Sequence, residues 1–223
     1  MQQPPLKKYK LETVITSYCK IKNNTILLND LEFLKGNETE DFLPFLSNVY
    51  KTIDLNYPKF FKMDKLCKLG TLAAELLIRN IPDFNTTPKN EVALVFANNA
   101  SSLESDRNHA NTIADKQNYF PSPSLFVYTL PNIVIGEIAI KHKITGENAF
   151  FISEKFDANL MYNYSSLLLK NKNSSLVICA WVNVDGNSHE AFAYCVKNGN
   201  FKEGNSGFNK PHNPDNTHYL YSL

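Results

Sequence analysis

A continuous apolar run at residues 91–97, with the sequence EVALVFA, constrains the fold of this chain more than any other feature. A strand with one face in water alternates apolar and polar side chains, so an unbroken short run is typical of a strand covered on both faces. Two similar runs follow at 175–184 and 190–196, and the Asp-Gly-Asn sequence at 185–187 favours a hairpin between them. The chain therefore needs helices on both sides of its sheet.

Helical patterns lie between these strands. The clearest spans 63–79, where leucine and alanine recur at helical spacing and Asp64 can act near the helix start. The other expected elements are a strand at 10–21 with a hairpin arm at 25–28, short helices within 40–62, and helices at about 103–116 and 156–170. This order predicts an α/β fold with right-handed crossovers and helices on both faces of the sheet.

The stretch 119–155 contains the most detailed local signals. Residues 125–128 are β-prone, and after a break an amphipathic helix follows, which Gly146 can end. Gly136 gives this helix a small-residue face, which lets another backbone come close. A short apolar run at 148–152 then predicts a buried strand. The chain becomes polar immediately afterwards, and chemistry often sits at such a strand end.

The composition favours one globular domain, residues 1–223, with a polar tail at 198–223. Hydrophobic residues make up 43% of the chain, which is enough for a large core. The 23 basic and 22 acidic residues give a net charge of +1 and no electrostatic argument for nucleic acid or a membrane surface. The N-terminus is polar and no run approaches a membrane span, so we expect a cytoplasmic protein.

The cysteines are far apart and lack metal-type spacing, so we expect neither a metal nor a cofactor. They are Cys19, Cys67, Cys179 and Cys195. A Cys/His nucleophile pair could be assembled from them, but positions inside a predicted helix and strands favour buried free thiols. His109 and His142 lie on predicted helices, where solvated or capping roles are favoured over catalysis.

Four segments carry a resemblance to a known family: MDKLCKLGTLAAE at 63–75, VFANNASSL at 95–103, PSPSLFVYTLPNIVIGEIAI at 121–140 and GENAFFI at 146–152. With the element order, they resemble the N-terminal half of a β-ketoacyl-[acyl-carrier-protein] synthase, over roughly residues 11–196. More narrowly, the chain is similar to short ketosynthase-like proteins of Bacteroidetes-type bacteria, often found with aryl-polyene or flexirubin-like pigment genes. The resemblance implies the thiolase fold, of which this chain has room for about one half.

The resemblance also implies where a nucleophile would stand. In condensing enzymes a cysteine lies at the N-terminus of a buried helix, where amide groups and the helix dipole favour the thiolate. Matching the turn at 146–147 places Ser153-Glu154-Lys155 on the family's Thr-Ala-Cys, so Lys155 replaces the cysteine and cannot carry an acyl thioester. The family's catalytic histidines come from the half that this chain lacks. His212 and His218, in the polar tail, are expected to be chance surface residues.

Neighbouring residues are expected to bind or to form an interface. Glu137 is predicted to be an exposed or interface carboxylate. Phe150 and Phe151 are predicted to be core or interface residues, because the resemblance places the equivalent strand at a dimer axis. Asn132 and Gly136 complete this expected surface.

Three functions stay open. The first is a non-catalytic accessory protein that pairs with a complete ketosynthase, or with itself, in the manner of a chain-length factor and shapes an acyl channel. The second is an active 3-oxoacyl-[acyl-carrier-protein] synthase component that uses a partner's cysteine or an unrecognised nucleophile. A Ser153–Lys155 dyad is disfavoured, because the two side chains need not face each other. The third is an acyl or acyl-carrier binding module.

Two further expectations concern partners. Acyl carriers are acidic, so the lysines at 7, 8 and 10, or Lys141 with Lys143, could dock one, although a solvated face is favoured for both groups. An isolated half of a thiolase fold is also expected to leave an apolar face that another copy or another protein must cover.

Overall fold

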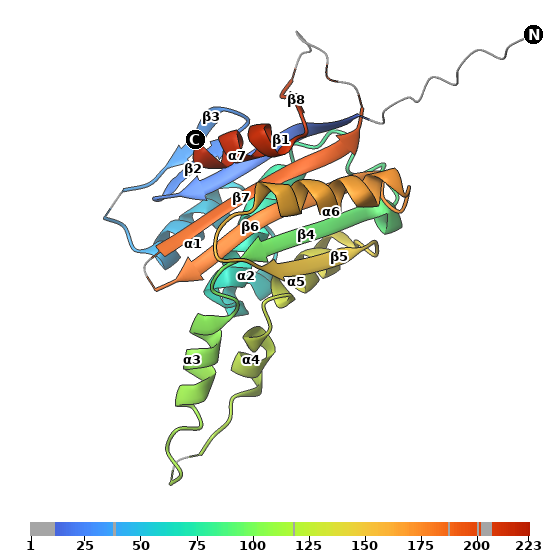
Figure 1. The fold of residues 1–223 in the computed structure, drawn as a ribbon. Helices are drawn as coiled ribbons and strands as arrows, with labels where there is room; N and C mark the ends of the chain where they lie inside the picture. The colour runs from blue at the N-terminus through green and yellow to red at the C-terminus, as the bar shows by residue number, and fades with distance from the viewer. Residues whose placement is uncertain (1–11, 38, 118, 187, 200, 202–206) are drawn as a thin grey trace, which may run out of the picture.

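The structure is a computed structural model, and it describes residues 12–223 apart from residues 38, 118, 187, 200 and 202–206. An eight-stranded mixed sheet forms its centre, in the order β3-β2-β1-β7-β6-β4-β5, with β8 paired to β1 (Figure 1). The strands are β1 (Thr13–Lys22), β2 (Thr25–Leu28), β3 (Leu31–Lys35), β4 (Val92–Asn98), β5 (Asn148–Ile152), β6 (Leu176–Asp185), β7 (Ser188–Asn198) and β8 (Lys210–Pro211). β4 is parallel to β5 and β6, whereas β7 is antiparallel to β6 and β1.

Helices cover both faces of this sheet (Figure 1). The helices are α1 (Phe42–Thr52), α2 (Lys65–Ile78), α3 (Leu103–Asn111), α4 (Pro123–Phe126), α5 (Ile133–His142), α6 (Ala158–Lys170) and α7 (Pro214–Ser222), with the 3₁₀ turns η1 (Pro58–Lys62), η2 (Lys89–Glu91) and η3 (Val127–Thr129). α1, α2 and α5 lie on one face, and α6 and α7 on the other. The predicted α/β fold is therefore confirmed.

Strand β4 shows why helices must cover both faces of the sheet. All of its residues are buried, as the apolar run predicts. Leu94 and Phe96 belong to the core under α2 and α5, whereas Ala93 and Val95 belong to the core under α6. Successive side chains of a strand point to opposite faces, so one continuous run supplies both cores.

Helices α2 and α5 approach each other at a glycine, but not at the predicted one. A Cβ atom on Gly70 would lie 2.4 Å from Cγ2 of Val134, so glycine is needed on α2. A Cβ atom on Gly136 would meet no heavy atom within 4 Å, so the prediction of a close approach there is wrong. Gly146 does not end α5, which ends at Lys143 with a φ of 57°. Instead, Gly146 lies against the backbone of Val92.

Two other predictions in the central stretch are wrong. Residues 125–128 are helical, because Ser122 accepts a hydrogen bond from the Leu125 amide and Pro123 occupies the first turn of α4. β5 is an edge strand, and none of its residues is fully buried. Its short apolar run reflects partial burial against two cores.

The segment predicted to be a polar surface tail contains α7, which packs on the sheet beside α6 (Figure 1). Thr217 and Leu220 are buried beneath it. The Tyr221 ring lies 4.3 Å from that of Phe156. The chain thus covers this face of its own sheet.

Helices α3 and α4 project away from the body (Figure 1). We call residues 103–130 the arm. In the part of the chain that the structure describes, no single helix is long and apolar enough to cross a membrane. Pro123–Thr129 and Ile133–His142 reach the required length and composition only as a pair, bent by 100°.

Candidate functional site

The carboxyl ends of the parallel strands β4, β5 and β6 meet at one edge of the sheet. The loop after β5 lies beside the loop after β4, since the Ser153 amide donates to the Asn98 carbonyl at 2.9 Å. Asn183 of β6 fixes the loop after β4, because its Oδ1 accepts from the amides of Asn99 and Ala100, both at 3.2 Å. Ligands of open α/β sheets bind outside this edge.

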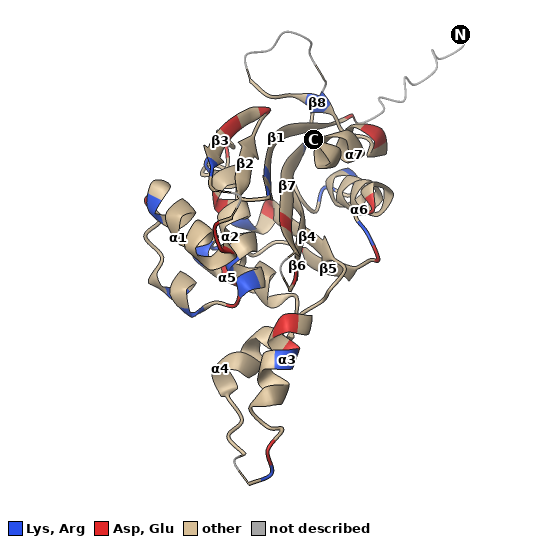
Figure 2. Ribbon diagram, turned by 90° about the vertical axis from the view of Figure 1, so that its left-hand side faces the viewer, with Lys and Arg blue, Asp and Glu red and all other residues tan. Residues whose placement is uncertain are grey.

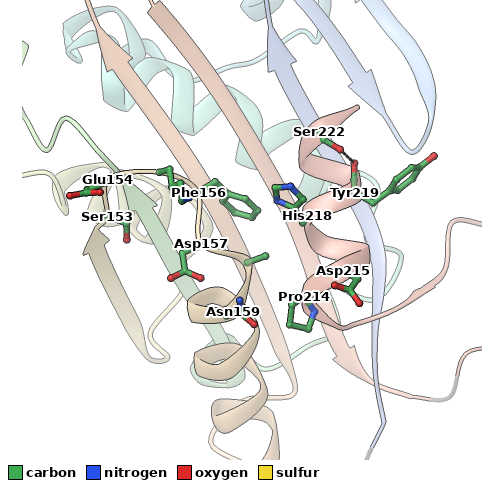
Figure 3. A pocket seen from close by; sticks show the side chains of 12 residues that line it. Ser153, Glu154, Phe156, Asp157, Asn159, Pro214, Asp215, His218, Tyr219 and Ser222 are labelled. Atoms are coloured by element: carbon green, nitrogen blue, oxygen red, sulfur yellow. Dashed lines mark hydrogen bonds between the residues drawn. The ribbon is translucent and has the colours of Figure 1, made fainter.

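An open groove of about 830 Å³ lies between the β5–α6 connection and α7. Figure 3 shows His218 on the side of α7 that faces Phe156. The groove brings the predicted residues Ser153, Glu154 and Lys155 together with His218, although we expected His218 to be a chance surface residue. Its other lining residues include Asp157, Asp215, Tyr219 and Ser222.

The residue that enters the protein at the start of α6 is Phe156, not Lys155. Lys155 is exposed, and Asp157 caps the helix by accepting a hydrogen bond from the Leu160 amide at 3.0 Å. Phe156 is buried, with its ring centroid 6.1 Å from that of Trp181 and 5.6 Å from that of Phe192. An aromatic cluster therefore fills the space behind the position expected to hold a nucleophile. The sequence signal was a single phenylalanine within the polar run SEKFDAN.

The thiols are unsuited to nucleophilic catalysis. Cys19, Cys67, Cys179 and Cys195 are all buried and free, as predicted. Burial raises the pKa of each thiol. A thiolate is the nucleophilic form, so these cysteines stay protonated and inert at neutral pH. Among the described residues, no three metal-binding side chains come together.

The two tail histidines differ. His212 is buried, so the expectation of a surface residue is wrong. Its Nδ1 lies 3.1 Å from Oγ1 of Thr13, and burial lowers its pKa to about 4. His218 is exposed and lines the groove. Of the two, only His218 can reach a molecule bound there.

Glu137 is not exposed, so that part of the prediction is wrong. It is buried on α5 and forms an ion pair with Lys59 at 2.8 Å. Burial, followed by the Glu137 charge, raises the pKa of Tyr128, so this tyrosine remains protonated. The carboxylate therefore belongs to a network beneath the arm.

The remaining predicted interface residues are spread over two elements. Asn132 is exposed immediately before α5, and Gly136 is half-buried within it. Phe150 and Phe151 are partly buried on edge strand β5 and pack against opposite cores. The structure does not bring these four residues into one cavity with Lys155.

Of the lysines considered for carrier docking, Lys141 is not available at the surface. Lys141 is largely buried and donates to Glu75 at 2.6 Å, while His142 lies 3.1 Å from the same carboxylate. Burial opposes ionisation of Glu75, but hydrogen bonds from His142, Lys141 and Arg79 outweigh it and lower its pKa. Lys143 is exposed. The lysines at 7, 8 and 10 lie outside the described residues.

His109 lies on the arm rather than at the groove. Its ring lies 5.4 Å from that of Phe126. The expectation that it is not catalytic stays a prediction.

No protein-family model and no curated protein sequence matches this chain. Solved structures do match its fold. The ishigamide ketosynthase/chain length factor matches with a TM-score of 0.60 and 15% identity, covering 86% of this chain and 63% of that one. This chain therefore spans less than two thirds of the length of that neighbour.

Two further structures share the fold. One is the ketosynthase (ApeO) in complex with its chain length factor (ApeC) from Xenorhabdus doucetiae, with a TM-score of 0.57, 15% identity, and coverage of 96% of this chain and 91% of that one. The other is a beta-ketoacyl synthase from Burkholderia phymatum, with a TM-score of 0.59, 8% identity, and coverage of 85% and 59%. The chain has a thiolase-like fold of the ketosynthase kind, consistent with about one half of a ketosynthase.

Proposed function

We propose that this protein is an accessory, non-catalytic ketosynthase-like subunit that pairs with a complete ketosynthase in the manner of a chain length factor. The observation that carries this proposal is the start of α6, where Phe156 is buried in an aromatic cluster and no cysteine is present. Acyl transfer by a condensing enzyme needs a thiolate that displaces the thiol of an acyl thioester. This position offers a lysine and a phenylalanine instead.

The solved neighbours support the pairing. Two of them are described as a ketosynthase together with a chain length factor. A third, at 12% identity and a TM-score of 0.59, is described as a type II polyketide synthase acyl-carrier protein in complex with its ketosynthase. We therefore propose fatty-acid or polyketide-type biosynthesis, of the aryl-polyene kind, as the setting. An acyl carrier protein is the proposed second partner.

The proposal is tested by co-expression with a complete ketosynthase from the same genome, followed by size exclusion with light scattering. A stable heteromer is the expected result. A chain that stays apart from every such ketosynthase would contradict the pairing.

Catalysis is tested separately on the purified chain. Incubation with an acyl thioester and intact-mass measurement should show no covalent acyl adduct. An adduct that disappears in Lys155→Ala or Ser153→Ala would show that the groove retains a nucleophile, and would favour the alternative of an active synthase component.

A further inference from the structure

The arm exposes large apolar side chains that the chain itself does not cover. They are Leu103, Tyr119, Phe120, Phe126, Val127 and Leu130. Phe120 is 74% exposed and Phe126 is 60% exposed. Isolated exposed apolar residues are ordinary, but contiguous exposed apolar surface marks interaction sites. Together these side chains expose on the order of 600 Å², close to the roughly 800 Å² that each partner buries in a stable complex.

The same region is almost free of charge. Residues 117–136 contain no Asp, Glu, Lys or Arg. Figure 2 shows the charged residues of the arm near the start of α3 and in the loop at its far end, while α4 carries none. Such a surface matches an apolar protein surface. It offers no lysine or arginine cluster for an acidic carrier or an anionic membrane.

The base of α3 is held firmly by polar contacts to the body. Ser105 Oγ donates to Asp64 at the start of α2 at 2.6 Å. Lys65 forms an ion pair with Glu104 at 2.7 Å. Two helices therefore share a fixed junction.

The returning half of the arm is tied to α3 and α5. Ser102 Oγ donates to the Thr129 carbonyl at 2.8 Å. Tyr128 is buried, and its hydroxyl interacts with Glu137 of α5. Both ends of the arm are thus fixed to the body before any partner arrives, which lowers the entropic cost of binding.

We infer that the arm is the docking surface for the partner ketosynthase, and that it inserts its apolar side chains into an apolar surface of that chain. This inference rests on the proposed function. The opposite candidate, the sheet face beside α6, is already covered by α7. A lipid surface fits less well, because α4 has four residues and the helix that follows it is buried against α2.

The test measures binding of the full-length protein to the co-expressed ketosynthase. The double substitution Phe120→Ser with Phe126→Ser should raise the dissociation constant at least tenfold, because aromatic side chains contribute most of the binding free energy at protein interfaces. The matched control is Leu31→Ser with Phe61→Ser, which removes apolar side chains of 72% and 56% exposure outside the arm. The control should bind like the natural protein, and circular dichroism should show both variants folded.

Three other outcomes would each contradict the arm inference. If the natural protein forms the heteromer and the arm variant binds equally well, the arm inference is wrong and the proposed pairing survives. If the natural protein forms no heteromer but self-associates through the arm, the arm inference and the proposed pairing with a ketosynthase are both wrong. In a third outcome, the natural protein does not bind the ketosynthase but binds anionic or neutral lipid vesicles, and the arm variant loses this binding. That result would assign the arm to a membrane and overturn the inference.

Discussion

Large apolar side chains are buried in the layer formed by α6 and α7, but they are exposed on the arm. In the layer, Phe156, Leu220 and Tyr221 pack against the sheet, and the chain's own last helix supplies the cover. On the arm, side chains of similar size remain exposed on helices that project from the body. The expected uncovered face of a half fold is therefore not the face beside α6. The exposed apolar side chains of the arm lie at the end of the sheet, where a partner can reach them.

The largest effect on stability is expected in the layer. Phe156→Ala should lower the free energy of unfolding by about 3–5 kcal/mol, because it empties the centre of the aromatic cluster. Lys155→Ala, at the exposed neighbouring position, should change it by less than about 0.5 kcal/mol. Urea unfolding of both variants checks this, and equal losses would refute the inward placement of Phe156.

The stability of the protein should depend on pH through the buried His212. Its pKa is about 4 when buried, against about 6.5 when unfolded, so the unfolded chain binds the proton more readily. Stability should be unaffected by this group above pH 6.5 and should fall as the pH drops towards 4, by at most about 3 kcal/mol. Melting curves from pH 7 to 4 for the natural protein and His212→Gln should diverge; parallel curves would show that His212 is not buried as described.

The base of the arm should respond to loss of its buried charge. Glu137→Gln leaves Lys59 without its partner, and should cost roughly 1–3 kcal/mol because Lys59 is partly exposed and regains water. Amide hydrogen exchange should rise in residues 123–130 more than in α6. Unchanged exchange in the arm would mean that this ion pair does not hold it.

The smallest effect on stability is expected at the surface of the arm. Phe126→Ser should change the free energy of unfolding of the isolated protein by less than about 0.5 kcal/mol, since most of the ring is already in water. Thermal melting checks this. A large loss would indicate that the arm packs on the body in solution.

Local sequence patterns predicted the elements whose residues are buried along most of their length. The run at 91–97 became β4, and Asp64 caps α2 by accepting from the Cys67 amide at 2.8 Å. The sequence could not show that Gly70 rather than Gly136 faces another helix, because spacing within one helix does not reveal which side meets a neighbour. α7 was hidden for a related reason. It is mostly polar and buries only Thr217 and Leu220.

The candidate site was predicted in part. The position of 153–155 after β5 followed from the strand end, and these residues do line the groove. The contribution of His218 depends on α7 folding back across the sheet. The burial of Glu137 likewise depends on Lys59, a residue far away in the sequence. Such pairings are set by tertiary contacts and leave no local pattern.

The central position of β1 has a consequence for how the chain folds. This first strand is flanked by β2 and β7, and it also pairs with β8, which comes just before the last helix. Lys20 of β1 donates to the Tyr221 carbonyl at 2.7 Å. Such long-range pairing slows folding, because the loop closure must occur before the contacts form. During synthesis, β1 must wait with one edge unpaired until β7 leaves the ribosome, and this interval is when the nascent chain is most open to aggregation.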